Sequence, residues 1–260
     1  MNKPCKCEFV REEITGLKIL VAYIVVTGAP HGCDLARDKR AGYLDRFVQT
    51  YQTNPPGVAH DLLAVCNGGE PSSAVRAKLA SIGAKFYVRP NDGGKDISAY
   101  QEVAEKFGDH YDFLVCLGES VFAHYPGWLA RWAEARAQLG PGMYGLYGTN
   151  TVRTHLQTTA FGIDPKYLRA YSKVTDNAGR MEFEHGHGAL WRRVVISGGR
   201  AWLVTWDGVY EPREWRVAPN IIWRGDQTNC LLFCNHTTPY AEGDALLKFT
   251  FARNADSAFK

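Results

Sequence analysis

Strand-like and helix-like segments alternate through the first 140 residues, and this alternation constrains the fold more than any other feature of the sequence. Apolar runs typical of buried strands occupy four ranges, 18–28, 61–69, 84–90 and 112–118. Segments with apolar residues at helical spacing follow these runs, at 38–53, 72–83, 97–108 and 126–140. Strands that are joined through helices lie parallel in one sheet. The order therefore predicts an α/β fold with a mostly parallel sheet flanked by helices on both faces.

The second half of the chain is less regular. Strands are expected at 143–149, 156–163 and 201–206, with a short helix at 164–171 and a longer helix at about 181–198. A length of 260 residues suits one large domain. We therefore expect an N-terminal extension at 1–17, a single domain at 18–237, and a C-terminal helix and tail at 238–260.

Composition and charge exclude several classes of protein. Apolar residues make up 45% of the chain and aromatic residues 12%, which is too much for a disordered protein. Thirty basic and 27 acidic residues give a net charge of +3, which does not favour binding to nucleic acid. The longest apolar run, 19–26, is far shorter than the roughly 18 residues of a spanning helix, so no transmembrane segment is expected.

The cysteines favour a reduced protein. Seven is an odd number, and Cys66 and Cys116 lie inside apolar strand-like runs, where a free thiol behaves as a small apolar group. The first residues mix proline, acids and bases and do not resemble a signal peptide, so a cytoplasmic location is expected. Five residues offer zinc-binding atoms at spacings unlike those of common zinc knuckles: Cys5, Cys7, Cys230, Cys234 and His236.

Small and polar residues follow each of the first four expected strands. They form the loops Thr27–Pro30, Asn67–Gly69, Asn91–Asp96 and Gly118–Ser120. Ligands of open α/β sheets bind beyond the carboxyl ends of the strands. Glycine lets a ligand approach the backbone, and Asn or Asp can hydrogen-bond a base or a ribose. Any one of these loops is also an ordinary turn, but four on one edge favour a nucleotide-type site. The chain contains neither GxGxxG after the first strand nor GxxxxGK[ST].

The order of several short segments resembles that of nucleotide-sugar glycosyltransferases with the GT-A fold, of the inverting family-two type and the rhamnan-synthesis-like bacterial type. The segments are RFVQTYQTNPPG (46–57), LLAVCNGG (62–69), NDGGKDISAYQ (91–101), FLVCLGESVFAHYPGWL (113–129), HLQTTAFGI (155–163), MEFEHG (181–186) and RGDQTN (224–229). The resemblance implies a GT-A-like fold and inverting transfer of a sugar from a donor such as a UDP-sugar to a hydroxyl acceptor, as in polysaccharide biosynthesis.

The resemblance also implies which residues hold the donor. They are Thr27, Asn67, Asn91, Gly93, Asp96, Glu119, His155, Gln157 and Arg224. The family's fourth strand normally ends in Asp-x-Asp, which holds a divalent ion on the donor diphosphate. This chain has Leu117-Gly118-Glu119-Ser120 there. Either Glu119 binds Mn²⁺ or Mg²⁺ with help from other groups, or basic and hydroxyl groups replace the ion, or transfer activity has been lost.

An acidic and imidazole-rich run at 182–187 is the candidate for the catalytic base. Inverting transfer needs a group that deprotonates the acceptor hydroxyl. Within the expected helix, Glu184 and His187 are neighbours, as are Glu182 and His185, each three residues apart. We expect Glu184 to be the base, with Glu182 as the alternative, and His187 to orient Glu184 or hold the sugar. The same acids also suit the start of a helix.

Two other functions remain open from the sequence. The first is a non-catalytic module that binds a sugar nucleotide or a glycan, which the missing Asp-x-Asp keeps open. The second is a Rossmann-like methyltransferase, against which stand the absent glycine signature and Asn67 in place of an acid after the second strand. The expected partners are a nucleotide-sugar donor and a glycan, lipid-linked glycan or other hydroxyl acceptor.

Overall fold

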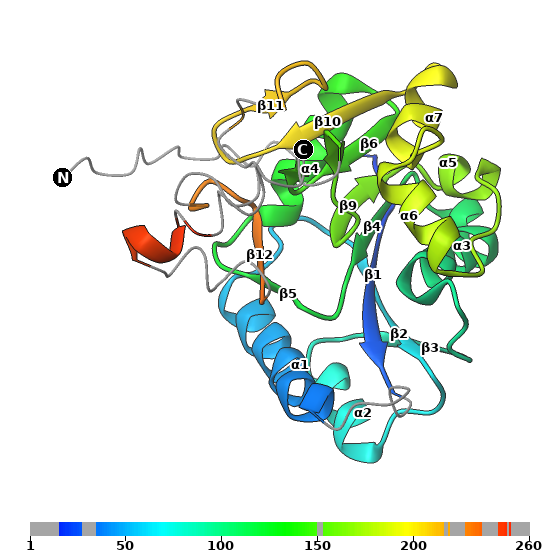
Figure 1. Ribbon diagram of the computed structural model, residues 1–260. Coiled ribbons are helices and arrows are strands. Elements are labelled where there is room, and N and C mark those ends of the chain that lie inside the picture. The colour runs from blue at the N-terminus through cyan, green and yellow to red at the C-terminus, as the bar shows by residue number, and fades with distance from the viewer. Residues whose placement is uncertain are drawn as a thin grey trace.

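The computed structural model describes residues 16–27, 35–149, 153–215, 218, 227–235, 244–248 and 250, with the backbone alone at 35–41. A single eight-stranded sheet runs through the molecule in the order β11-β10-β6-β9-β4-β1-β2-β3 (Figure 1). Its strands are β1 (Ile19–Val26), β2 (Asp61–Asn67), β3 (Lys85–Arg89), β4 (Phe113–Leu117), β6 (Gly142–Gly145), β9 (Ala160–Ile163), β10 (Arg200–Val204) and β11 (Val209–Tyr210).

The first four strands are parallel to one another. β1 pairs in parallel with β2 and with β4, and β2 pairs in parallel with β3. β9 is antiparallel to both β4 and β6, whereas β10 is parallel to β6. The predicted GT-A-like α/β fold with a mostly parallel sheet is confirmed. The carboxyl ends of β1 to β4 consequently lie along one edge, which is where the candidate site is built.

Both faces of the sheet are covered, because alternate residues of the central strand are buried on opposite sides. Ile19, Val21 and Tyr23 belong to one core, and Leu20 and Ala22 belong to the other. The first core packs against α1 (Leu35–Thr53), α2 (Ser73–Ala80) and α4 (Trp128–Leu139). The second packs against α3 (Lys95–Phe107), α5 (Pro165–Ala170), α6 (Asn177–His185) and α7 (Leu190–Ile196), with a short 3₁₀ turn, η1 (Gly108–His110), after α3.

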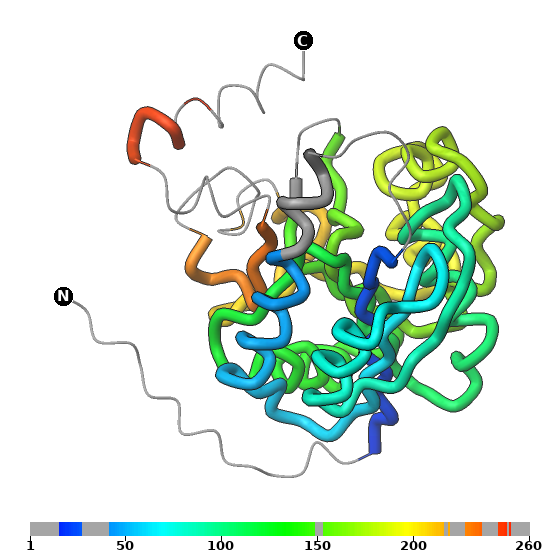
Figure 2. The backbone as a smooth tube through the Cα atoms, turned by 90° about the horizontal axis from the view of Figure 1, so that it is seen from below, coloured from blue at the N-terminus to red at the C-terminus, as the bar shows by residue number. Residues whose placement is uncertain are grey.

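Short strands beside the main sheet tie distant parts of the chain together. β5 (Val121–Ala123) pairs with β12 (Leu232–Cys234), and both views place this pair beside α1 (Figure 2). The Arg46 guanidinium on α1 lies 3.7 Å from the Phe122 ring and donates a hydrogen bond of 2.9 Å to Asn235. A second small pair joins β7 (Gly148–Thr149) to β8 (His155–Leu156). β8 carries His155 toward the candidate site.

The predicted helix at 181–198 is wrong in one respect: two helices occupy this region. α6 ends at His185, and α7 begins at Leu190. Gly186 is extended, with φ −68° and ψ −179°, and a Cβ placed on it would lie 1.8 Å from a carboxylate oxygen of Glu182. The helix breaks here because the carboxylate turns back over the glycine and accepts a hydrogen bond from the Gly188 N–H.

Smaller differences concern strand ends and short strands. The range 143–149 divides into β6 and β7, and 156–163 overlaps two strands, β8 and β9. Of the expected tail, only 244–248 and 250 are described, and 245–248 are helical. Among the described residues, no helix is both long enough and apolar enough to cross a membrane.

Candidate functional site

The ends of β1 and β2 are closed by backbone and hydroxyl hydrogen bonds. The Thr27 hydroxyl donates to the Gly69 carbonyl at 2.7 Å, and the Thr27 N–H donates to the Asn67 carbonyl at 3.3 Å. Both residues lie at the predicted edge of the sheet, next to one another. The two residues form the base of the candidate site, and their role in binding a nucleotide-sugar donor stays a prediction.

Arg89, at the end of β3, is the buried centre of a polar network. Its side chain is 3% exposed and donates to Asn67 Oδ1 at 2.6 Å, Asp92 Oδ2 at 2.7 Å, Glu102 Oε2 at 2.8 Å and Ser98 Oγ at 3.3 Å. Burial alone would raise the pKa values of both carboxyls, but hydroxyl donors and the guanidinium hold these pKa values below their usual range. Arg89 thereby fixes the Asn67 amide and the turn that opens α3.

Two glycines bring that turn against the segment that begins α6. A Cβ on Gly93 would lie 2.2 Å from the Thr175 carbonyl oxygen, and one on Gly94 would lie 2.2 Å from the Val174 carbonyl oxygen. Only glycine permits so close an approach of two backbones. The starts of α3 and α6 are therefore held together. Asn91, in the same turn, is exposed.

Asp96, in the first turn of α3, faces Arg180 on α6. Arg180 Nη2 donates to Asp96 Oδ1 at 3.1 Å, and about a quarter of each side chain is exposed, 28% for Asp96 and 26% for Arg180. Burial raises the pKa of Asp96, Arg180 opposes that rise, and the nearby Glu184 adds to it. Deeper in the site, the Tyr100 hydroxyl has no hydrogen-bond partner among the described residues. Asp96 and Arg180 thus form a partly exposed pair of opposite charges between the starts of α3 and α6.

Glu184, also on α6, is held by β8 and the residues after it. Its Oε1 accepts a hydrogen bond of 3.2 Å from the Thr158 N–H and lies 3.9 Å from His155 Nε2. His155 Nδ1 donates to the Arg153 carbonyl at 2.6 Å. Burial lowers the pKa of His155 to about 4, so the ring is neutral at pH 7 and its contact with Glu184 is not an ion pair.

Three ligand atoms lie close enough to hold a divalent cation. One atom each from His155, Glu184 and His185 lies within 4.8 Å of the others. Glu119, the metal ligand expected from the sequence, is half-buried after β4, and its carbonyl accepts a hydrogen bond of 2.9 Å from the Tyr23 hydroxyl. In the described part of the chain Glu119 belongs to no such group of three, so a metal held through Glu119 stays a prediction.

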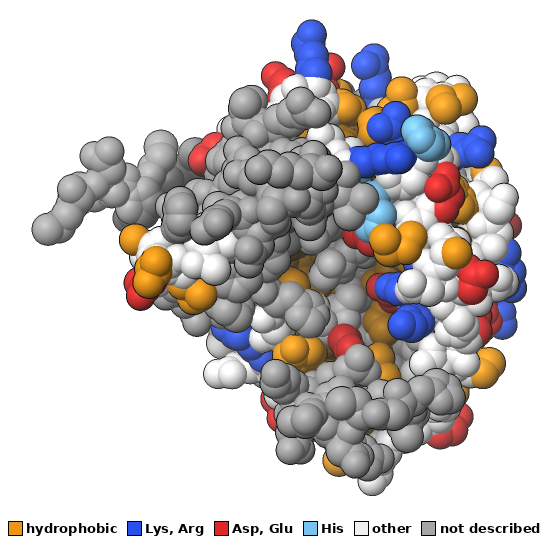
Figure 3. All heavy atoms as spheres, in the orientation of Figure 1, with side chains coloured by type: hydrophobic (Ala, Val, Ile, Leu, Met, Phe, Trp, Pro, Cys, Tyr) orange, Lys and Arg blue, Asp and Glu red, His pale blue; other side chains and the backbone are white. Residues whose placement is uncertain are grey.

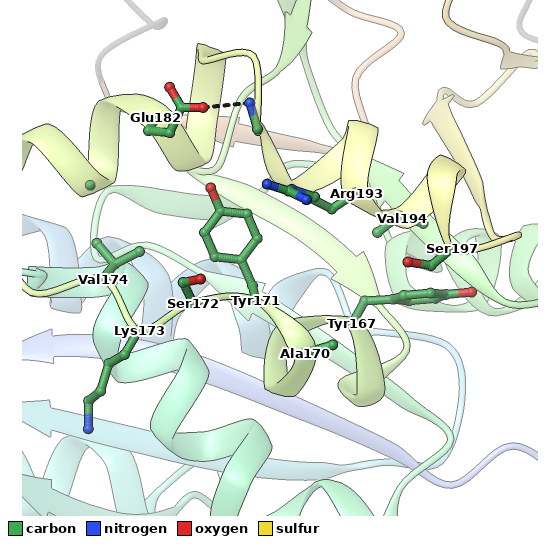
Figure 4. Close-up of a pocket in the computed structure, with 12 residues that line it drawn as sticks. Tyr167, Ala170, Tyr171, Ser172, Lys173, Val174, Glu182, Arg193, Val194 and Ser197 are labelled. Carbon is green, nitrogen blue, oxygen red and sulfur yellow. Dashed lines mark hydrogen bonds between the residues drawn. The ribbon is translucent and has the colours of Figure 1, made fainter.

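The two glutamates of α6 lie on different sides of the helix. Glu182 lines a separate pocket of about 400 Å³ between α5, α6 and α7, and Figure 4 shows it there above Tyr171 and Arg193. Glu184 instead contacts β8, as described above. His187 is exposed and lies beyond the end of α6, so the expected helical pairing of Glu184 with His187 is wrong. His155 and His185 take its place beside Glu184.

Figure 3 shows a hollow on the face seen in Figure 1, with acidic, basic and imidazole side chains on its described right-hand rim. Sequence reasoning did not single out Arg180, and it paired His185 with Glu182 and not with Glu184. Arg180 and His185 both lie on the helix of Glu184, and Arg180 is four residues before it, a spacing that places the two side chains on one face.

The other predicted residues are less informative. Gln157 is half-buried, and its N–H donates to the Tyr147 carbonyl at 2.9 Å. Arg224 lies outside the described residues. Of the zinc candidates, Cys230 and Cys234 are buried, while the other three also lie outside the described residues.

Comparison with known proteins gives similarity at the level of structure. No protein-family model matches the chain, and no curated protein is significantly similar to it in sequence. A Desulfovibrio desulfuricans G20 protein assigned as a nucleotide-diphospho-sugar transferase aligns over 70% of this chain and 75% of its own, with 16% identity and a TM-score of 0.42. TarS 1–349 of S. aureus, in complex with UDP, aligns over 64% of this chain and 54% of its own, with 7% identity and a TM-score of 0.46.

Another structure of S. aureus TarS aligns over 53% of this chain and 23% of its own, with 10% identity and a TM-score of 0.38. The chain thus spans about half or less of the TarS structures that it matches. At these identities and TM-scores, the similarity concerns the outline of the fold alone.

Proposed function

We propose that this chain transfers a sugar from a nucleotide-sugar donor to a hydroxyl group of an acceptor, with inversion at the sugar carbon. The observation that supports the proposal is the convergence of Asp96, Arg180 and Glu184 at the carboxyl edge of the parallel strands. This edge is where open α/β sheets bind nucleotides. The order of sequence motifs that resembles GT-A glycosyltransferases supports the same assignment.

Each group has a chemical role in this proposal. Asp96, with Thr27 and Asn67 beneath it, binds the base and ribose of the donor. Arg180 meets the diphosphate, whose negative charge grows as it leaves. Glu184 activates the acceptor: the acceptor oxygen attacks the sugar carbon, the bond from that carbon to the diphosphate breaks, and the hydroxyl proton passes to the carboxylate. A single displacement of this kind inverts the sugar carbon.

For the acceptor, we propose a chemical class. We propose a glycan or a lipid-linked glycan, made in the cytoplasm during polysaccharide biosynthesis. The described rim of the hollow in Figure 3 carries both charges and imidazoles, which suits hydrogen bonding to several hydroxyl groups.

A donor screen tests the proposal. The full chain is melted in the presence of UDP-, GDP- and CMP-sugars and of S-adenosylmethionine, each with and without Mn²⁺. Stabilisation by one nucleotide sugar, followed by its turnover with an acceptor or water, is the expected result. Stabilisation by S-adenosylmethionine alone would assign the site to a methyltransferase.

A non-catalytic module is the second candidate, and the observation that favours it is Leu117-Gly118-Glu119-Ser120 at the end of β4. In that case a nucleotide sugar raises the melting temperature, but neither transfer nor hydrolysis is detected at any metal concentration. The same screen therefore separates the two candidates.

A further inference from the structure

His155, Glu184 and His185 bring three electron-pair donors together. One ligand atom of each lies within 4.8 Å of the other two. The first comes from β8, and the other two come from the last turn of α6. His155 is 29 residues from Glu184 and 30 from His185 in sequence, and the fold brings it beside them.

Hydrogen bonding fixes which atom of His155 points at Glu184. The Nδ1 atom of His155 donates to the Arg153 carbonyl, so Nε2 is the ring nitrogen that faces the carboxylate, at 3.9 Å from Glu184 Oε1. The His155 side chain is only 4% exposed, so little water reaches this atom.

His185 adds a third group without a donor between it and the others. Its ring centroid lies 4.8 Å from that of His155. Its Nδ1 is buried and has no hydrogen-bond partner within the described part of the chain, while its Nε2 lies 3.3 Å from the sulfur of Met181. The Nδ1 atom is therefore not committed to another partner among the described residues.

We infer that His155, Glu184 and His185 bind one divalent transition-metal ion. Two imidazole nitrogens and one carboxylate oxygen favour Zn²⁺ and related ions over Mg²⁺ or Ca²⁺, which take oxygen ligands. With bonds of about 2.0–2.1 Å, the ligand atoms of tetrahedral zinc lie about 3.4 Å apart, so the three groups close by roughly an ångström when the ion binds.

The surroundings already resemble those of a metal site. The Arg153 carbonyl orients His155 through its other ring nitrogen, as backbone carbonyls do for metal-binding histidines. The Thr158 N–H holds the Glu184 carboxylate. Three protein ligands leave at least one position open for an outside oxygen. We assign that position to an oxygen of the donor diphosphate or the acceptor, and this assignment, unlike the ion itself, rests on the proposed function.

Metal binding is tested without substrate. The purified full chain is freed of metal with a chelator and titrated with Zn²⁺ by calorimetry, and with Co²⁺ by its visible absorption. The expected result is one equivalent that is lost, or weakened at least tenfold, in His155→Ala, Glu184→Gln and His185→Ala. The controls, His187→Ala and Glu182→Gln, change the adjacent exposed imidazole and the carboxylate of the other pocket, and they should keep this equivalent.

Two further measurements exclude misfolding of a variant and metal binding by cysteines as explanations of the result. His185 is half-buried and outside the sheet, so His185→Ala is the variant expected to keep the melting temperature of the wild type. An equivalent bound by cysteines would persist in all three ligand variants and show thiolate absorption with Co²⁺. Wild-type affinity in both His155→Ala and His185→Ala, or no binding by the unmodified chain, overturns the metal site.

The outcomes also separate the ion from the proposed function. Zn²⁺ binding by a chain that shows no binding or turnover of any nucleotide sugar upholds the metal site and removes the proposed function. If the wild type keeps full turnover in excess EDTA, and His185→Ala also keeps full turnover, the ion does not bind an oxygen of the substrate.

Discussion

Arg89→Met is the substitution that tests most directly how the carboxyl edge of the sheet is held. The methionine keeps most of the volume and removes every donor. It leaves Asn67 Oδ1, in a residue that is 3% exposed, without its guanidinium partner. It also takes the guanidinium away from the carboxylates of Asp92 and Glu102, of which Glu102 keeps Lys106 at 3.6 Å. The variant therefore removes the buried cation at the centre of the network, while Ser98 still donates to Asp92 and Tyr87 still donates to Glu102.

The structure sets the size of the effect. Removing one partner of a buried ion pair costs about 3–5 kcal/mol. Here the side chains of Asp92 and Glu102 are 39% and 23% exposed, so water compensates part of the loss and the lower end, about 3 kcal/mol, is expected. At roughly 2–4 °C per kcal/mol for a chain of this size, the melting temperature should fall by about 6–12 °C.

The pH dependence gives a second, independent readout. Because the pKa values of Asp92 and Glu102 are lowered in the folded chain, their contribution to stability is present above the unfolded values of about 4 and is lost as the pH falls through the folded values. The difference in melting temperature between wild type and Arg89→Met should therefore be largest near pH 7 and shrink below about pH 4.

Thermal melts of the wild type, Arg89→Met and a control, Arg213→Met, decide the question. The Arg213 side chain is 79% exposed and pairs with Glu211, so its loss should cost less than about 1 kcal/mol. If Arg89→Met melts within about 2 °C of Arg213→Met at pH 7, the network does not hold this edge and the reasoning from burial is wrong.

Three further predictions concern the site. Gly94→Ala places a Cβ 2.2 Å from the Val174 carbonyl and should lower the melting temperature. The control, Gly42→Ala on α1, has open space and should stabilise the chain slightly, by about 0.5–1 kcal/mol. Asp96→Ala should weaken binding of the nucleotide sugar in calorimetry by tenfold or more, about 1.4 kcal/mol, and unchanged affinity would remove Asp96 from the site. Glu184→Gln should lower turnover by roughly 100-fold or more, measured as steady-state kcat.

The sheet could be predicted from the sequence because its signals are local. The run 19–26 is continuously apolar, as a strand buried on both faces must be, and helical periodicity indicated α1 and α3. The short strands β5 and β12 could not be predicted in the same way. Each has three residues, and they pair across more than 100 residues of chain, so no local pattern marks them.

The candidate site was only partly predictable, for the same physical reason. The polar residues after β1 to β4 followed from the rule that ligands bind at the carboxyl edge. The contact of Glu184 with His155 depends on where β8 meets α6, which periodicity does not report. His187 was paired with Glu184 because the helix was expected to continue past residue 187, whereas α6 ends at His185 and Gly186 follows it.

Glu184 has a role in both proposals, as the catalytic base and as a ligand of the ion, and its two carboxylate oxygens make the two roles compatible. Oε1 faces His155 and the Thr158 N–H, so it is the oxygen placed to bind the ion, and Oε2 remains to receive the acceptor proton. Glu184→Gln removes both abilities, whereas His185→Ala removes only the ion. If the ion holds the donor diphosphate, both variants raise KM, and only Glu184→Gln loses turnover at saturating donor. If the ion binds the acceptor oxygen instead, His185→Ala lowers kcat with donor affinity intact. Loss of donor affinity in Glu184→Gln with unchanged kcat would show that this carboxylate binds substrate and takes no proton.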